Sequence, residues 1–439
     1  MSSPKKKSSV RHTRAISRNR RQQPSGEVAP EQIEALFKEV VHPATLEQVA
    51  EYKRRGHRER TLTLPIMVAL TLSLIWRQLS SVRDAVRLLN EEGVFWTGPI
   101  AVTASAVTDR FKTLPAELFR NVLFDVLPRL HVRWTERSRP LPAAVAWAKR
   151  HYAEIVAFDG STLDALNRSV NLLPERKGLA GRMAAVLDVV SHLPKALWYE
   201  EDSQAHDQTF WERIVETLTP GTLALFDLGF VNYAFFGYLT RKRVTFITRL
   251  KTNASFHVVQ VLREGSNAQD ALLTLGSGST RCEETLRRVA VLYQGKWYRY
   301  LTNELDPEKL PPEQVVALYG QRWRIEDAYA VVKRLLGLSY FSVSSINGVQ
   351  IQLWATWVLY ALLVDLTDAV AQRLQQPFQM ISMEMVYRGI AHFTRALKRG
   401  AATDPVESLA QKAKLLGIVK QKRPKSLDAL HLLTTQLHA

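Results

Sequence analysis

One stretch decides how this chain is interpreted: Tyr319-Gly-Gln-Arg322-Trp-Arg-Ile-Glu326-Asp-Ala-Tyr-Ala-Val-Val-Lys333. It follows a pair of prolines at positions 311 and 312, which predicts a long helix that begins there and ends near residue 336. At about 100° per residue, Tyr319, Arg322, Glu326 and Lys333 fall within an arc of roughly 60°. An acid, two bases and a phenol therefore share one narrow stripe. Taken alone, such a stripe is also typical of a solvated helix face held by i,i+4 pairs.

Two aspartates stand where short apolar runs end, upstream of this stretch. Asp159 follows Ile155–Phe158, and Asp227 follows Leu223–Phe226. Short apolar runs bounded by Gly or charge predict strands, and open α/β sheets place their chemistry at strand ends. Considered singly, Asp159 is equally explained as a strand-end cap and Asp227 as a turn initiator before Gly229. Considered one at a time, the three acids therefore do not show whether they belong to one site.

The surrounding sequence alternates between helical and strand-like texture. Helical spacing predicts an all-helical N-terminal part, with segments at Leu64–Leu79, Ser81–Asn90, Thr103–Phe111 and Pro115–Leu127. Short apolar runs predict strands at Glu154–Phe158, Met183–Val190, Lys195–Tyr199, Thr222–Phe226, Val244–Leu250, Phe256–Leu262, Glu284–Tyr293 and Trp297–Thr302. Helices are expected at Gln208–Leu218 and from Tyr233. The uncharged run Leu353–Val364 is too short to span a bilayer and predicts a buried helix.

The charge of the chain is strongly basic and unevenly distributed. The formal net charge is +17 over 439 residues, and residues 1–21 hold eight Lys or Arg with no acid. Residues 391–439 hold nine Lys or Arg against three acids. A polyanion such as nucleic acid is attracted to such a surface and releases counterions on binding. The single cysteine, Cys282, excludes an intrachain disulfide and fits a reducing compartment.

The four residues of the helix stripe resemble a known signature. Tyr-x2-Arg-x3-Glu-x6-Lys is characteristic of bacterial insertion-sequence transposases of the insertion-sequence-four type, and the chain matches at all four positions. Asp159 lies in a block similar to the family's first catalytic block. Asp227 lies in a block similar to its Asp-Arg-Gly-Phe/Tyr block, although Leu228 replaces the usual arginine. The resemblance covers about residues 150–365 and includes Phe246–Lys251, which is similar to the strand that opens the family's β-rich insertion.

The resemblance implies an RNase H-like α/β core that is interrupted by a β-rich insertion and flanked by helical regions. The expected segments are a basic disordered arm (1–30), a helical DNA-binding domain (31–148), the first part of the core (149–240), the insertion (241–305), the second part of the core with the glutamate helix (306–345) and a C-terminal helical basic region (346–439). Within the helical domain, Ser105–Arg110 precedes a basic amphipathic stretch that suits a helix-turn-helix. A plain helical bundle explains it equally.

The implied chemistry is phosphodiester cleavage and strand transfer at three metal-binding, catalytic acids, Asp159, Asp227 and Glu326. Two Mg²⁺ ions, with Mn²⁺ as a substitute, would be held by these carboxylates, because hard cations prefer oxygen ligands. Tyr319, Arg322 and Lys333 would contact DNA phosphates. The implied partners are the terminal inverted repeats of an element and target DNA, with a homodimer in the DNA complex and no membrane. The implied location is the bacterial cytoplasm, at the nucleoid.

Other residues near these blocks have simpler explanations. Asp164, Asp188 and Asp207 also lie near strand or helix ends; Asp188 is expected to be an internally satisfied polar group, and Asp207 a helix N-cap. Trp323 is able to stack on a base, but its angle on an ideal helix favours packing against the core. The Gly276–Ser279 segment is expected to be a turn.

Three alternatives to a transposase remain at the level of sequence. The first is a catalytically silent, domesticated DNA-binding regulator, and the second another RNase H-like nuclease, which would lack the four-residue helix signature. The third, a two-carboxylate glycosidase, accounts for neither the basic charge nor the helix stripe.

Overall fold

A computed structural model describes residues 31–56, 61–163, 181–202, 206–230, 233–276, 281–338, 341–343 and 345–421. The predicted basic arm (1–30), Asp164, residues 277–279 of the predicted turn and residues 422–439 lie outside this described part. The described chain forms two compact units. The first contains residues 31–138 and 329–419, and the second contains residues 139–162, 181–328 and 420–421.

The first unit is helical. Its helices are α2 (Glu31–Arg54), α3 (Leu64–Trp76), α4 (Val82–Glu91), α5 (Ala104–Thr113), α6 (Ala116–Thr135), the π-helical turn η6 (Val331–Leu335), α12 (Ile346–Arg373), α13 (Met383–Lys398) and α14 (Pro405–Gln411). Hydroxyl side chains cap helices α4 and α5: Ser81 accepts from the Asp84 amide and Thr103 from the Ala106 amide. The segment Ser105–Arg110 lies within α5, which packs against α4.

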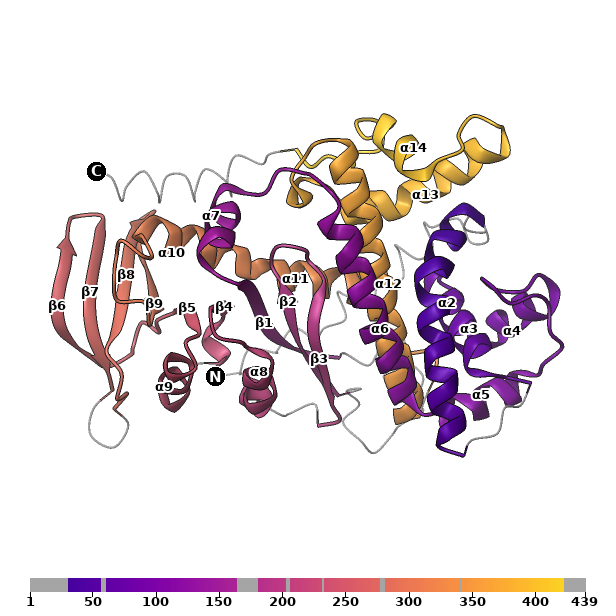
Figure 1. Cartoon of the computed structure of the whole chain (residues 1–439), viewed down its shortest axis with the longest axis horizontal. Coiled ribbons are helices and arrows are strands. Elements are labelled where there is room, and N and C mark those ends of the chain that lie inside the picture. The colour runs from indigo at the N-terminus through magenta and orange to yellow at the C-terminus, as the bar shows by residue number, and fades with distance from the viewer. Residues whose placement is uncertain are drawn as a thin grey trace, which may run out of the picture. The chain divides into compact units, whose positions relative to one another are not determined.

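Helix α12 runs through the centre of the helical unit, where it packs against α6, α3 and α5 (Figure 1). By length and composition alone it is able to cross a membrane. However, 89% of its most apolar window is buried inside the structure. The predicted buried helix Leu353–Val364 is confirmed as part of α12, because every one of its residues is buried.

The second unit is built on one nine-stranded sheet with the order β3-β2-β1-β4-β5-β9-β8-β7-β6. The strands are β1 (Glu154–Thr162), β2 (Arg182–Asp188), β3 (Pro194–Glu200), β4 (Thr222–Phe226), β5 (Thr245–Arg249), β6 (Phe256–Glu264), β7 (Ala268–Leu275), β8 (Leu286–Tyr293) and β9 (Lys296–Thr302). Strands β3, β2 and β1 are antiparallel neighbours, whereas β4 and β5 run parallel to β1. This is the RNase H-like arrangement expected for the core.

The β-rich insertion continues this sheet instead of forming a separate one. Strand β9 pairs with β5, and the antiparallel strands β8, β7 and β6 follow. Two strands in this region differ from the prediction. Strand β5 lies in the range assigned to the insertion, yet it pairs in parallel with β4 as the fifth strand of the core. Strand β7 was not predicted, because Gln269 and Asp270 interrupt its apolar pattern.

Helices cover both faces of the core strands (Figure 1). One face is covered by α8 (Trp211–Thr217) and α9 (Tyr233–Arg241), and the other by α10 (Pro312–Tyr319), η5 (Gly320–Arg322) and α11 (Trp323–Ala330). Helix α7 (Ala143–His151), which was not predicted, packs against α10. The fold is therefore a three-layer α/β/α sandwich over its core strands.

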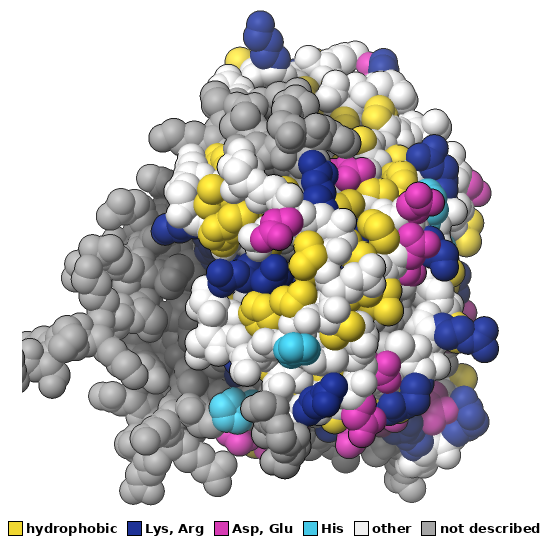
Figure 2. Space-filling model, turned by 90° about the vertical axis from the view of Figure 1, so that its left-hand side faces the viewer, with side chains coloured by type: hydrophobic (Ala, Val, Ile, Leu, Met, Phe, Trp, Pro, Cys, Tyr) yellow, Lys and Arg dark blue, Asp and Glu magenta, His cyan; other side chains and the backbone are white. Residues whose placement is uncertain are grey.

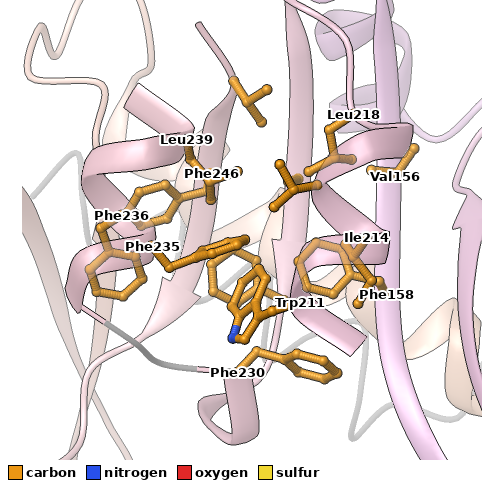
Figure 3. Packing of buried hydrophobic residues seen from close by; sticks show 14 of the residues in the cluster. Val156, Phe158, Trp211, Ile214, Leu218, Phe230, Phe235, Phe236, Leu239 and Phe246 are labelled. Carbon is orange, nitrogen blue, oxygen red and sulfur yellow. The ribbon is translucent and has the colours of Figure 1, made fainter. Parts of the chain in front are cut away.

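An aromatic cluster fixes the register of the first layer against the sheet. Phe158 of β1 stacks on Phe226 of β4 with ring centres 4.9 Å apart, and both rings meet the edge of Trp211 from α8. Phe236 of α9 stacks on Phe246 of β5. Figure 3 shows these rings converging between the two helices and the strands. Because side chains alternate along a strand, the residues after Phe158 and Phe226 face the opposite layer.

Candidate active site

The two candidate aspartates lie side by side on neighbouring parallel strands. Strands β1 and β4 pair in register up to Phe158 and Phe226, so Asp159 and Asp227 occupy the next positions on the two strands. Strands that are hydrogen-bonded neighbours lie about 4.8 Å apart. Asp159 was expected where β1 ends, but β1 continues to Thr162, so this aspartate lies inside a strand. Asp227 immediately follows β4, as predicted.

The helical segment that carries the third acid, Glu326, changes its type along its length. The predicted single α-helix after Pro311 is in fact α10, one 3₁₀ turn (η5), α11 and the π-helical turn η6. The 3₁₀ turn packs against β1 and β4. A 3₁₀ helix advances by about 120° per residue instead of 100°, so three residues add roughly 60° of rotation. Side chains after Arg322 therefore point in directions that an ideal α-helix does not predict.

Arg322 is at the centre of the site. Its Nη2 donates to Glu326 Oε1 at 2.8 Å, and its Nη1 lies 3.9 Å from Asp159 Oδ2. The Arg322 side chain is 4% exposed, whereas Asp159 and Glu326 are 20% and 35% exposed. Burial alone would lower the pKa of Arg322, but its interactions with Tyr319, Asp227 and Glu326 outweigh burial and raise it. The guanidinium is therefore a permanent cation among the acids.

The hydrogen bonding of Arg322 is incomplete. Among the described residues, its buried Nε and Nη1 find no hydrogen-bond partner. A buried donor without a partner is costly unless something else satisfies it. The guanidinium thus retains two donors for an incoming acceptor.

Tyr319 completes the contacts around Asp227. Its hydroxyl donates to Asp227 Oδ1 at 3.2 Å, and its ring lies under the Arg322 guanidinium, 5.7 Å from ring centre to Cζ. Burial is the main cause that raises the pKa of Tyr319 above its usual value, and the charge of Asp227 adds to it. The phenol therefore stays protonated and acts as a hydrogen-bond donor.

Trp323 departs from its prediction. Packing against the core was expected, but the side chain is 55% exposed. The rotation contributed by the 3₁₀ turn explains the difference. The Arg322 guanidinium lies 5.4 Å from the centre of the Trp323 ring, which gives a cation–π contact beside the acids.

Lys333, the fourth residue of the predicted stripe, is assigned to the other compact unit. It belongs to η6 in the first compact unit, whereas Tyr319, Arg322 and Glu326 belong to the second.

Arg249 is a residue of this site that the sequence analysis did not select. It ends β5, beside β4, and its guanidinium lies 5.4 Å from the ring centre of Tyr298. Its charge also lowers the pKa of Tyr319, although burial outweighs this effect. Tyr300, whose pKa burial raises to about 12, packs its ring 5.2 Å from the Tyr319 ring. The sequence feature that could have identified Arg249 is its position: it is a basic residue at the end of a buried strand, and the neighbouring strand ends in an acid.

Asp188 and Asp207 were assigned other roles in the sequence analysis. Asp188 ends β2, and its Oδ1 accepts from the Val190 amide at 2.7 Å, as expected for an internally satisfied group. Asp207 is not at the N-cap: His206 occupies that position, and Asp207 is the first residue of the 3₁₀ turn η2 (Asp207–Phe210). Cys282 is buried with a free thiol.

The donor set suits a divalent cation in its chemistry, with one rearrangement. Asp159, Asp227 and Glu326 offer the carboxylate oxygens that Mg²⁺ prefers. In this conformation, no group of three or more His, Cys, Asp or Glu among the described residues is gathered closely enough to hold an ion. Arg322 supplies the positive charge there, and Glu326 is paired with it. For all three acids to hold one ion, Glu326 would have to leave Arg322.

Comparison with known proteins places the fold and site in a class. Residues 153–362 match the family model described as the transposase DDE domain. The match covers all of β1 to β9 and continues into α12 of the first unit.

The relatives give the particular family. A transposase of Sinorhizobium fredii named y4zB is 30% identical over 191 residues, which cover 42% of this chain and 52% of that protein. The transposase named for insertion sequence IS5377 of Geobacillus stearothermophilus is 21% identical over 79% of this chain and 88% of its own length. Transposase InsG of element IS4 from Escherichia coli is 23% identical over 41% of this chain and 42% of its own length.

Over residues 153–362 the chain is similar to the DDE transposases of bacterial insertion sequences. It spans about half the length of y4zB and less than half of InsG. The resemblance inferred from Tyr319, Arg322, Glu326 and Lys333 is confirmed at the level of this family.

Proposed function

We propose that this chain binds the terminal inverted repeats of its element and carries out metal-dependent cleavage and strand transfer of DNA. The observation that carries the proposal is the register of β1 with β4, which sets Asp159 beside Asp227, together with Arg322, which joins Asp159 to Glu326. These three carboxylates, from two strands and a helix, would together hold the metal. The family generally uses divalent metal ions, and the oxygen-only donor set favours Mg²⁺, with Mn²⁺ as a substitute.

Asp159, Asp227 and Glu326 would hold two ions and act as the catalytic acids. When bound, such ions supply Lewis-acid chemistry that activates the attacking oxygen and stabilises the leaving oxygen. In cleavage, water attacks phosphorus at the element end, the P–O3′ bond breaks, and the 3′-hydroxyl is freed. In strand transfer, that 3′-hydroxyl attacks a target phosphorus and loses its proton, and the 3′-oxygen of the target strand leaves.

The neighbouring side chains have roles in holding DNA. Arg322 keeps its charge while buried, and its Nε and Nη1 have no hydrogen-bond partner among the described residues. It would therefore donate hydrogen bonds to a scissile phosphate that binds beside the acids. Tyr319 remains a neutral donor because of its burial. Lys333 would contribute a point charge to the same strand. The exposed ring of Trp323 offers a stacking surface for a base close to the cleaved bond.

The partners and place of action follow from this chemistry. The substrates would be an element end and target DNA, met at the nucleoid of a bacterial cell. Two ends must be joined in one event, so a homodimer in the DNA complex is part of the proposal. Helices α4 and α5, which pack together in the first unit, are the candidate helix-turn-helix for the terminal repeat.

Cleavage of a labelled duplex that carries the element's own end, with Mg²⁺, tests the proposal. Glu326→Gln and Asp227→Asn should each raise the activation free energy of cleavage by several kcal/mol, which lowers the rate roughly 1,000-fold or more. DNA binding should be retained in both variants. Asp327→Asn is the matched control, because Asp327 is the adjacent acid on α11 and pairs with Arg324 at 3.0 Å. Binding without cleavage by the wild-type protein, in Mg²⁺ and in Mn²⁺, would instead identify a DNA-binding regulator.

A further inference from the structure

A basic groove lies in the first unit, and its described lining residues include none of those in the candidate active site. It has a volume of about 530 Å³ and is formed by α13 and by the segment that follows α14. Four cationic side chains line it, Arg388, Arg395, Arg399 and Lys412, together with His392. The described lining residues include no Asp or Glu. Arg388 is paired with Glu384, one turn earlier on α13.

The walls of the groove are held at a close distance. Gly389 is on the lining face of α13, and a Cβ at this position would lie 2.6 Å from Leu409 Cδ2 and 3.3 Å from Leu416 Cδ1. A larger residue would require the side chains of Leu409 and Leu416 to shift. The glycine therefore permits the contact that brings Lys412 opposite the arginines.

The floor and rim of the groove are apolar. Met385, Leu415 and Leu416 line it, and Leu415 is 84% exposed. A leucine this exposed, beside a row of cations, favours a ligand that combines negative charge with an apolar surface. A deoxyribose-phosphate backbone has both, because its sugars carry little charge between phosphates.

The spacing of the cations fits a nucleic-acid strand. Arg388 and Arg399 are 11 positions apart, which corresponds to about 16 Å along a helix. A strand of B-DNA carries one phosphate per about 3.4 Å of its axis, so this length faces roughly five phosphates. The excess of nine Lys or Arg over three acids in residues 391–439 adds to the attraction.

We propose that the groove between α13 and the segment after α14 is a second DNA-binding site, which takes the sugar-phosphate backbone of duplex DNA without reading its sequence. It rests on the proposed function in one respect, that DNA is the substrate of this chain. Its role is to hold DNA outside the cleaved bond, so that the helical unit and the catalytic unit each grip the duplex.

The test measures the affinity of the full chain for a random-sequence duplex in EDTA, across a series of salt concentrations. Arg395→Ala/Arg399→Ala should weaken binding by about tenfold at low salt and reduce the log–log salt slope by about 1.8, or 0.9 for each lost phosphate contact. Arg395→Lys/Arg399→Lys should retain most of the affinity. Thermal unfolding of each variant checks that the helical unit still folds.

A matched control removes the same charge from the same unit. Arg54→Ala/Arg129→Ala takes away two exposed arginines that pair with Glu51 and Glu47 and do not line the groove. An equal loss of affinity in this control would reduce the effect to net charge and overturn the proposal. Unchanged DNA affinity in the groove variant would also overturn the proposal. Light scattering then tests whether the groove instead binds an acidic surface on a second copy of the chain, in which case the variant would lose self-association.

Failure of this proposal and failure of the proposed function are distinguishable. Wild-type protein that binds duplex through the groove but never cleaves an element end contradicts the catalytic proposal alone. Normal cleavage together with an unaffected salt slope in the groove variant contradicts the groove alone.

Discussion

Two buried arginines, one in the β-rich insertion and one in the candidate active site, are built in opposite ways. Arg287 on β8 is fully buried and donates from Nε and Nη2 to the two oxygens of Asp270, while Nη1 donates to the Leu310 carbonyl. Arg322 is nearly as buried but has one hydrogen bond, to Glu326, and two donors that find none among the described residues. A completed pair stabilises a fold, whereas an incomplete one is available to a ligand.

The largest effect is expected on the free energy of unfolding, when the complete Arg287–Asp270 pair is disrupted. Arg287→Met should lower the free energy of unfolding by about 3–5 kcal/mol, because it leaves the carboxylate of Asp270 buried without its partner. Urea unfolding of the full chain measures it. Arg287→Met/Asp270→Leu should recover most of the loss, since the uncompensated charge is gone. A single variant as stable as wild type would show that the pair is not structural.

Substitution of Arg322, whose hydrogen bonding is incomplete, should affect cleavage and metal binding more than the free energy of unfolding. Arg322→Met should slow cleavage about 100-fold, because a preorganised donor to the reacting phosphate is lost. It should also tighten the binding of Mn²⁺ in the absence of DNA, measured by electron paramagnetic resonance, since a competing cation leaves Asp159 and Glu326. The neighbouring variant Arg324→Met serves as control. Mn²⁺ affinity that is equal in all three proteins would contradict a competition between Arg322 and the metal.

The exposed ring next to Arg322 allows a smaller test. Trp323→Ala should weaken binding to the element end by about 1 kcal/mol, because a stacking surface is removed. Its unfolding free energy should stay within about 0.5 kcal/mol of wild type, as for other exposed positions. Trp323→Phe should restore most of the affinity. A loss of stability instead of affinity would return Trp323 to the packing role that an ideal helix predicts.

A third buried base, His192, extends the comparison to pH. Burial, reinforced by the charges of Arg324, Arg139 and Lys420, holds the pKa of His192 well below its usual value of 6.5. The unfolded chain therefore takes up a proton below about pH 6.5 that the folded chain does not, so stability is lost as pH falls through that range, by at most about 1.4 kcal/mol per pH unit.

His192→Asn should reduce this acid sensitivity. Asparagine tolerates the positive φ of 63° at this position, so the backbone need not change. Urea unfolding at pH 7.5 and 5.5 compares the two proteins. An identical drop in both would assign the acid lability to other groups.

The contrast between the two arginines also separates what the sequence could and could not predict. Strands β1 and β4 were predicted because each is a continuous apolar run that ends at an acid, which is the pattern of a strand buried on both faces. Strand β7 was missed because Asp270 interrupts its run, and a buried carboxylate is recognisable only when its partner Arg287, 17 residues away, is known.

The same limit applies inside the site. The identities of Asp159, Asp227 and Glu326 came from local blocks of sequence, whereas the side-by-side register of the two aspartates required the strand pairing. The orientation of Trp323 depended on three residues adopting a 3₁₀ turn, a choice made by packing against β1 and β4. A helix period calculated for an ideal α-helix carries no information on that turn.

The nine-stranded sheet has one further consequence, for how this chain is able to change over evolution. It ends at β6, which has a strand on one side only in the described part of the chain and carries the exposed Val258, Val259 and Val261. Figure 2 shows that side of the molecule, with yellow apolar and blue cationic side chains intermingled on it. Strands are free to be gained or lost at this margin while β1 and β4 keep their alignment. A strand added beyond β6 would therefore leave the two aspartates side by side, whereas a single inserted residue within β1 or β4 would shift one of them out of register.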